Sequence, residues 1–291
     1  MKYINYIAFL VLLAIATACS DKNVEYNMEP VDTAHQAELQ IFYMAPKTAV
    51  SSNYIYQVGI NGVNYANNGS TLITTFNGVP GGAVGMYYTV ASGDVTITLY
   101  HRLDGVNIDA DPFYTGKARG LKAGGKYQVF VVDDNEDPIV LEAGDMPTYG
   151  GSTETAEYCG TKWYNFMYEA DGTPSPDKLQ LYMRGDSTQQ YDEPLGKPIG
   201  FGECTDWESL HVTKTVYNSS GYQSRYYTFH VIDGTTGEDK GQLEYVSNTA
   251  GRVKAFTDYW TWFIGRQYRL YVHGVRTSKT VRVAVSRWTA Y

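Results

Sequence analysis

The feature that most constrains the fold of this chain is the alternation of apolar and polar side chains in short segments along most of its length. The segment DVTITLY, residues 94–100, places Val95, Ile97 and Leu99 on one face and hydroxyl-bearing side chains on the other. A period of two residues is that of a β-strand with one buried face, and we find no long stretch with the 3.6-residue period of a helix. The sequence therefore predicts an all-β fold built from antiparallel strands.

Composition supports this prediction and excludes one class of function. The 291 residues include 27 tyrosines, which favour half-buried sheet surfaces, and 29 glycines, which favour turns. The length and a hydrophobic content of 43% are enough for about two domains with sizeable cores. The net charge is −8, and no cluster of Lys and Arg is present, so the chain lacks the basic surface that a nucleic-acid-binding protein needs.

The N-terminus carries a signal for export and lipid attachment. Lys2 precedes ten consecutive apolar residues, 7–16, which as a helix would span about 15 Å and so cannot cross a membrane. Such a run is typical of a signal peptide. Ala16, Thr17 and Ala18 come directly before Cys19. This pattern resembles a bacterial lipobox, in which the cysteine is acylated and becomes the new N-terminus; the alternative is an ordinary secretory signal with a coincidental cysteine.

The residues after Cys19 suggest where the mature protein is located. The sequence SDKN resembles the surface-export signal of Bacteroidota lipoproteins, which favours the exterior face of the outer membrane over the periplasm. We predict a signal peptide over residues 1–18 and a flexible lipidated tether over residues 19–36. Two or more acyl chains hold a protein stably at a membrane.

Two series of strand-like segments follow the tether and resemble each other. AELQIFYMAP in the first series is similar in placement to TKWYNFMYEA in the second, and in both series a glycine turn precedes a tyrosine, Tyr127 or Tyr268, that starts an alternating strand. The Pro- and Gly-containing sequence EAGDMPTYGGS lies between the series. We therefore expect two tandem β-sandwich domains of immunoglobulin-like or prealbumin-like type, over residues 37–146 and 152–291, the second a divergent repeat of the first.

The first series also resembles a known family. The order of a strand ending near APK, an INGV hairpin, the core segment YYTVASGDVTITLY and the strand GLKAGGKYQVFVV is similar to that of the bacterial domain-of-unknown-function family 4397. The resemblance covers residues 37–142 well and residues 160–288 poorly. It implies a β-sandwich in a cell-envelope protein and implies no catalytic residue.

Candidate metal sites, cofactor sites and disulfides are few. The five histidines lack metal-ligand spacing, the acidic segment 133–137 has the character of a hairpin turn, and we expect neither a metal nor a cofactor. Cys159 and Cys204 could form a disulfide in an oxidising compartment, closing a loop worth roughly 4 kcal/mol, or stay as two free thiols. No hydrolase motif is present, so we expect a protein that is not an enzyme.

The remaining functional feature is aromatic. In the segment DYWTWFIG, Trp260 and Trp262 share one face of an expected strand, and Tyr259, Thr261 and Phe263 share the other. An exposed pair of indoles would form a platform for sugar rings, whereas a buried pair would belong to the core. We expect a non-catalytic binding or adhesion module, with glycans as one candidate partner. A structural or accessory subunit of an envelope assembly and an all-β hydrolase are the alternatives.

Overall fold

The computed structural model describes most of the chain after the predicted tether. The described residues are 30–66, 71–79, 87–104, 107–148, 157–184, 190–212, 222–247 and 251–290. Apart from one 3-10 turn at Ser51–Asn53, they form strands and loops, so the predicted all-β fold is confirmed. Residues 32–291 form one compact unit. Cys19 and the predicted signal peptide lie outside the described residues, and within the described part no helix is long and apolar enough to cross a membrane.

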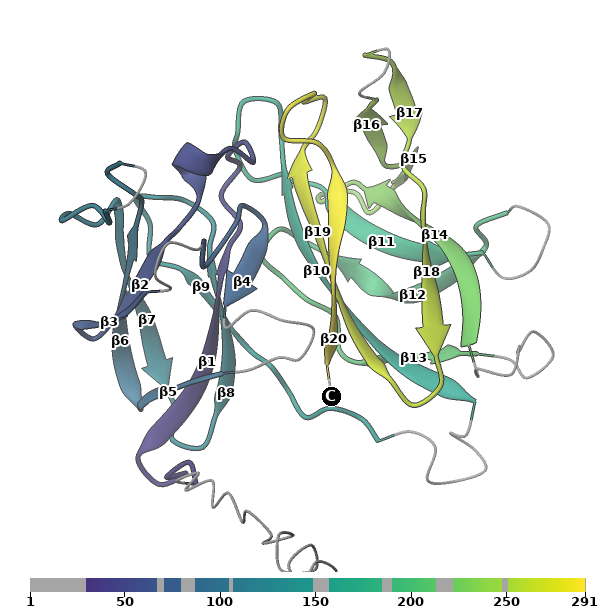
Figure 1. Ribbon diagram of the computed structural model, residues 1–291. Coiled ribbons are helices and arrows are strands. Elements are labelled where there is room, and N and C mark those ends of the chain that lie inside the picture. The colour runs from purple at the N-terminus through teal and green to yellow at the C-terminus, as the bar shows by residue number, and fades with distance from the viewer. Residues whose placement is uncertain are drawn as a thin grey trace, which may run out of the picture. The chain divides into compact units, whose positions relative to one another are not determined.

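The first half of the described chain, residues 36–142, forms two sheets (Figure 1). Sheet 1 has the order β3-β2-β6-β7, with bounds Val63–Ala66, Gln57–Ile60, Gly93–Tyr100 and Tyr114–Leu121. Sheet 2 has the order β4-β1-β8-β9, with bounds Asn77–Val79, Gln36–Tyr43, Lys126–Val131 and Ile139–Glu142, and β5, Tyr88–Ala91, also pairs with β1. The predicted inner residues Val95, Ile97 and Leu99 are fully buried in the core between these sheets.

The second half, residues 158–290, repeats this plan with longer strands. Sheet 3 has the order β13-β10-β19-β20, with bounds Glu208–His211, Tyr158–Tyr168, Gln267–Val275 and Ala284–Ala290. Sheet 4 has the order β12-β11-β14-β15, with bounds Glu193–Ile199, Lys178–Met183, Tyr222–Ile232 and Asp239–Gln242, and β18, Asp258–Phe263, pairs with the N-terminal part of β14. A small hairpin joins β16, Glu244–Val246, to β17, Val253–Ala255. Trp163 and Trp262 lie in the core that these strands enclose.

The prediction of purely antiparallel sheets is wrong for one strand pair in each half. β1 pairs with β8 in parallel, and β10 pairs with β19 in parallel. Parallel neighbours need a long crossover between them, and here several other strands of each half lie between the two parallel partners in the chain. Alternation of apolar side chains reports which face is buried and carries no information on strand direction, which is why the sequence did not reveal these pairs.

The segments that resemble each other in sequence have matching local structure. The hydroxyl of Tyr127 accepts a hydrogen bond from the backbone N–H of Lys122 at 2.9 Å, and the hydroxyl of Tyr268 accepts one from the N–H of Phe263 at 3.0 Å. In both cases the donor lies five residues before the tyrosine. A glycine with positive φ, Gly124 or Gly265, stands three residues before each tyrosine and allows the chain to turn. The same tyrosine-anchored turn therefore starts β8 and β19.

The parallel strands are buried on both faces. In β1, Leu39, Ile41 and Tyr43 pack into the core of the first half, whereas Phe42 lies in a separate aromatic cluster. This cluster, called the shared core below, combines first-half and second-half residues. Its buried members are Phe42, Met44, Phe76, Phe130, Tyr164, Phe166, Tyr168, Tyr271, Val275 and Val281. Such double burial explains why nearly every residue of β10 and β19 is buried, polar ones included.

Hydrogen bonds satisfy most of the polar groups in the shared core. The amide of Gln128 donates to the hydroxyl of Tyr271 at 2.8 Å, and its carbonyl oxygen accepts a bond from the hydroxyl of Tyr164. The hydroxyl of Tyr168 lies within hydrogen-bond distance of the carbonyl oxygens of Met44 and Val132 in the first half. Burial raises the pKa of the Tyr271 hydroxyl, so these tyrosines stay neutral.

His273 in the shared core predicts a loss of stability in acid. Its ring stacks on Phe76 with centroids 4.2 Å apart, its Nε2 is 2.9 Å from Ser286 Oγ, and burial lowers its pKa to about 3. Because the unfolded chain takes up a proton near pH 6.5 and the folded protein does not, stability should fall as pH drops from about 6.5 toward 3. This group alone should remove about 2 kcal/mol between pH 7 and pH 5.

The measurement is urea unfolding of the unmodified protein and of His273→Asn at pH 7 and at pH 5. The other titrating groups are common to both proteins, so the difference between the two pH slopes isolates His273. Parallel slopes would contradict this assignment.

Candidate functional site

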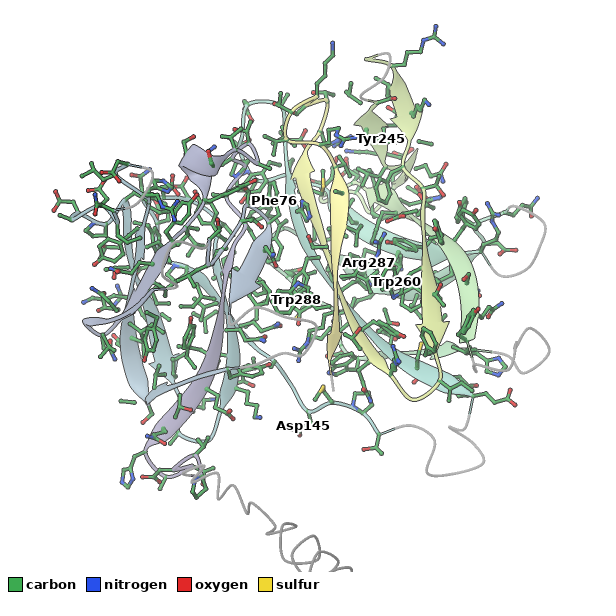
Figure 2. The ribbon with its side chains drawn as sticks, in the orientation of Figure 1. Phe76, Asp145, Tyr245, Trp260, Arg287 and Trp288 are labelled. Carbon is green, nitrogen blue, oxygen red and sulfur yellow. The ribbon has the colours of Figure 1, made fainter. Side chains whose placement is uncertain are left out.

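The two tryptophans of β18 point into the protein. Trp262 is fully buried, with its ring in edge contact with Tyr268 at 5.2 Å between centroids. Trp260 is half-buried against the core of the second half, and the guanidinium of Arg287 lies 4.8 Å from its ring centroid (Figure 2). Of the two alternatives that the sequence left open, the structure therefore shows a pair that packs in the core and no platform of two exposed indoles, because the large rings fill the inner face of sheet 4.

The opposite face of β18 carries the exposed aromatic side chains. Tyr259 is 57% exposed and Tyr226, directly across from it on β14, is 45% exposed. Their ring centroids are 5.6 Å apart with an interplanar angle of 45°. Rings of this size are exposed at few positions of the described chain, and these two form a contiguous apolar surface.

The paired strands extend this surface in regular steps. Ser224 and Thr261 form the next cross-strand pair, with their hydroxyl oxygens 2.8 Å apart, and Tyr222 and Phe263 the one after, with ring centroids 5.1 Å apart. We call these three cross-strand pairs, Tyr226–Tyr259, Ser224–Thr261 and Tyr222–Phe263, the aromatic ladder. Its two aromatic pairs are separated by four residues, which is about 13 Å along an extended strand.

An arginine lies at each end of the aromatic ladder. The guanidinium of Arg184 is 4.5 Å from the ring centroid of Tyr226 and 5.1 Å from that of Tyr191. At the other end, the guanidinium of Arg266 is 4.2 Å from the ring centroid of Phe263. A cation over a ring face is attracted to the π-electrons, so the arginines fix the orientation of these rings and supply hydrogen-bond donors beside them.

Partly buried ion pairs hold the strands beneath the aromatic ladder. The Arg225 guanidinium donates to the carbonyl oxygen of Arg184 at 2.7 Å and pairs with the carboxylate of Glu193. The carboxylate of Asp258 pairs with Arg287 and accepts a hydrogen bond from the hydroxyl of Tyr227 at 3.0 Å. The surface is thus rigid, apolar in its rings and polar at its edges, which suits binding by stacking and hydrogen bonding.

One strand of this surface has a recognisable pattern in the sequence. In YQSRYYTF, residues 222–229, Tyr222, Ser224 and Tyr226 recur at every second position, as an exposed strand face requires. That alternation is a signal from which half of the aromatic ladder could have been predicted. Pairing of this segment with residues 258–263 depends on antiparallel contact between β14 and β18, which are far apart in sequence. No local pattern specifies that contact.

The two other cysteines are free thiols, so of the two open alternatives the disulfide is not formed. Cys159 lies in the core of the second half, where burial raises its pKa to about 12, and Cys204 packs beside the shared core. The backbone of Cys204 forms an isolated β-bridge with that of Tyr164. Tyr164 lies five residues along β10 from Cys159. Five residues of strand span about 17 Å, whereas a disulfide needs Cα atoms within about 7 Å.

The acidic segment 133–137 is a turn that ties the first half together. The Asp134 carboxylate pairs with Lys47 at 2.9 Å and accepts a bond from the hydroxyl of Tyr43 at 2.8 Å. The backbone N–H of Lys117 and the guanidinium of Arg119 hold the pKa of Asp137 below its usual range. The described residues contain no group of His, Cys, Asp and Glu side chains that could hold a metal ion.

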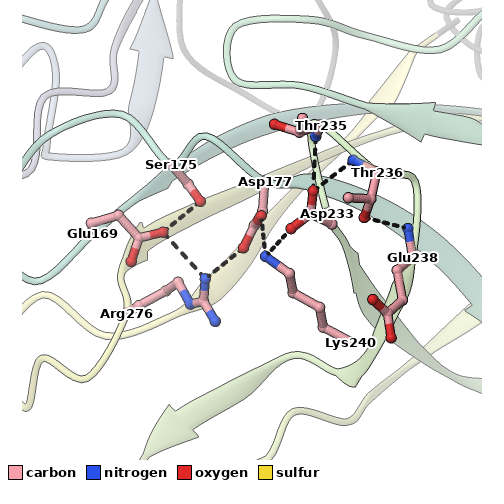
Figure 3. A network of polar contacts seen from close by, with 9 residues as sticks. All are labelled: Glu169, Ser175, Asp177, Asp233, Thr235, Thr236, Glu238, Lys240 and Arg276. Carbon is pink, nitrogen blue, oxygen red and sulfur yellow. Dashed lines mark hydrogen bonds and ion pairs between the residues drawn. The ribbon is translucent and has the colours of Figure 1, made fainter.

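A second polar network closes one end of the second half (Figure 3). The carboxylate of Asp177, a residue that is 9% exposed, forms ion pairs with Lys240 at 2.8 Å and with Arg276 at 3.2 Å. Lys240 also contacts Asp233 at 2.7 Å, and Arg276 also contacts Glu169 at 3.2 Å. Every charged group in this chain of contacts has an opposite partner, which identifies the network as a structural link between loops.

The comparisons with known proteins give only weak similarities. No protein-family model and no curated protein matches the chain, so the resemblance to family 4397 stays a prediction. One solved structure is that of a candidate cell adhesion protein from Bacteroides eggerthii, which has 9% sequence identity to this chain and a TM-score of 0.24. The match covers 88% of this chain and 97% of the Bacteroides eggerthii chain. A candidate adhesin from Bacteroides ovatus has 10% identity and a TM-score of 0.21, covering 86% and 94%. Similarities this low carry no argument about function.

Proposed function

We propose that the chain is a non-catalytic adhesion module that binds glycans through the aromatic ladder. The observation that supports this proposal is the exposed pair Tyr226 and Tyr259, with Arg184 at its edge. A sugar ring has a flat C–H face and a rim of hydroxyl groups. Aromatic rings match the face, and guanidinium and hydroxyl groups match the rim.

The chemistry around the aromatic ladder favours binding over hydrolysis. A glycosidase needs two carboxyl groups facing each other across its substrate. The carboxylates beneath the ladder, Glu193 and Asp258, are each engaged by an arginine on the inner side of the sheet. They are therefore placed to hold strands together.

The proposal includes a location for the protein. A lipid on Cys19 would hold the mature chain at the outer face of the outer membrane, and the tether would let the aromatic ladder reach glycans outside the cell. The lipobox-like residues before Cys19 and the sequence SDKN after it support this location. The net charge of −8 favours partners other than nucleic acids.

The test is a glycan array probed with the full chain, purified from membranes in mild detergent, and with the double variant Tyr226→Ala/Tyr259→Ala. Each stacked ring contributes about 1 kcal/mol, so removing both should weaken binding about 30-fold. The matched control is Tyr65→Ala, which removes a 37% exposed tyrosine from the first half. Binding to no glycan, or equal binding by the double variant and the unmodified chain, would contradict the proposal.

A further inference from the structure

Two cationic side chains lie side by side on the central strands of sheet 3, β10 and β19. Lys162 on β10 and Arg269 on β19 are direct partners in the parallel register, so their side chains leave the sheet on the same face. Lys162 is 6% exposed and Arg269 is 4% exposed. Like charges directly opposite each other in a sheet repel, and burial increases the cost of leaving either charge uncompensated.

The hydrogen-bond acceptors that the chain offers these two cations are few and uncharged. The Lys162 ammonium donates to the carbonyl oxygen of Ala143 at 3.4 Å, and Arg269 Nη1 donates to the hydroxyl of Tyr87 at 3.4 Å. Both distances are long for hydrogen bonds of charged groups. Arg269 Nε is buried with no hydrogen-bond partner. Within the described ranges, neither cation forms an ion pair with a carboxylate.

The thiol of Cys204 beside them does not supply the missing negative charge. Burial raises the pKa of Cys204, and this effect outweighs the lowering by Lys162 and Arg269. The side chain is therefore a neutral thiol near pH 7. Cys204, Tyr87 and Trp207 are each only partly buried, and the Trp207 ring centroid lies 5.6 Å from the Arg269 guanidinium. These three side chains lie next to the cationic pair and are partly exposed to solvent.

We propose that Lys162 and Arg269 form a binding site for a small oxyanion, such as a carboxylate, phosphate or sulfate group, that enters past Tyr87, Cys204 and Trp207. An oxyanion accepts bonds from a guanidinium, an ammonium and a hydroxyl at once. It would occupy the free Nε donor and neutralise the repulsion between the two side chains. The site is separate from the aromatic ladder, which lies on sheet 4.

The experiment measures the melting temperature (Tm) of the full chain in sodium chloride. The measurement is then repeated after part of the sodium chloride is replaced by 10 mM sulfate, phosphate or acetate at constant ionic strength. We expect Tm to rise by about 3 °C with the bound anion. A rise with sulfate and phosphate assigns a tetrahedral ligand, and a rise with acetate alone assigns a carboxylate.

Two variants and one control separate a site from a general salt effect. Lys162→Met removes one cation and leaves an unbranched side chain one atom shorter, and Arg269→Gln removes the other cation. Both variants should abolish the anion-dependent rise. Lys178→Met, at an exposed position of β11, should keep it. Sulfate also stabilises proteins by exclusion from their surface, which would raise Tm equally in every variant. An equal rise in Lys162→Met, or no rise with any of the three anions, would overturn the proposal.

Discussion

Replacing Phe42 by alanine should lower the free energy of unfolding by about 3–5 kcal/mol. The ring of Phe42 is fully buried in the shared core. Its centroid lies 4.9 Å from that of Phe130 in its own half, and 5.0 Å and 5.2 Å from those of Tyr271 and Trp288 in the second half. The truncation therefore leaves a cavity that the surrounding strands of sheets 2 and 3 cannot close.

Scanning calorimetry of Phe42→Ala measures this loss. The matched control is Tyr259→Ala, which removes an aromatic ring that is 57% exposed and should change the free energy of unfolding by less than about 1 kcal/mol. A Phe42→Ala variant as stable as this control would show that the shared core contributes little to folding.

Replacing Asp177 by asparagine should lower the free energy of unfolding by about 2–3 kcal/mol. The substitution keeps the shape of the side chain but removes the negative charge that Lys240 and Arg276 share. We place the expected effect below that of a fully buried pair because the side chains of Lys240 and Arg276 are 42% and 32% exposed and water screens them in part.

Urea unfolding at neutral pH measures the effect of Asp177→Asn. Asp94→Asn is the matched control, because Asp94 forms an ion pair with Arg119 at 3.7 Å in which both side chains are more than half exposed. Water screens that pair, so its loss should change the free energy of unfolding far less than the loss of the Asp177 charge does. Equal losses in the two variants would mean that the network of Figure 3 has no special role in joining the loops.

The sequence predicted the strands of the fold much better than their partners. The buried positions Val95, Ile97 and Leu99 follow directly from alternation, because one face of their strand is covered and the other is not. The matching turns before Tyr127 and Tyr268 were also visible in the sequence, because a turn is a local structure. The parallel pairing of β10 with β19 was not, because it joins residues about one hundred positions apart.

The candidate site shows the same limit. The segment that contains Trp260 and Trp262 indicated two aromatic faces, and nothing local specified which face the core would cover. The face with the larger rings, Trp262 above all, became the core, which left Tyr259 to pair with Tyr226 on the surface. The facing cations Lys162 and Arg269 come from distant strands and have no sequence signature.

The central structural claim is that sheets 2 and 3 are each buried on both faces, so that the two halves fold together and leave the outer face of sheet 4 for binding. The most direct test is the calorimetric trace of the unmodified chain, which is also the reference for Phe42→Ala. A shared core predicts a single transition whose calorimetric and van't Hoff enthalpies agree. Two separate transitions, one for each half, would contradict it.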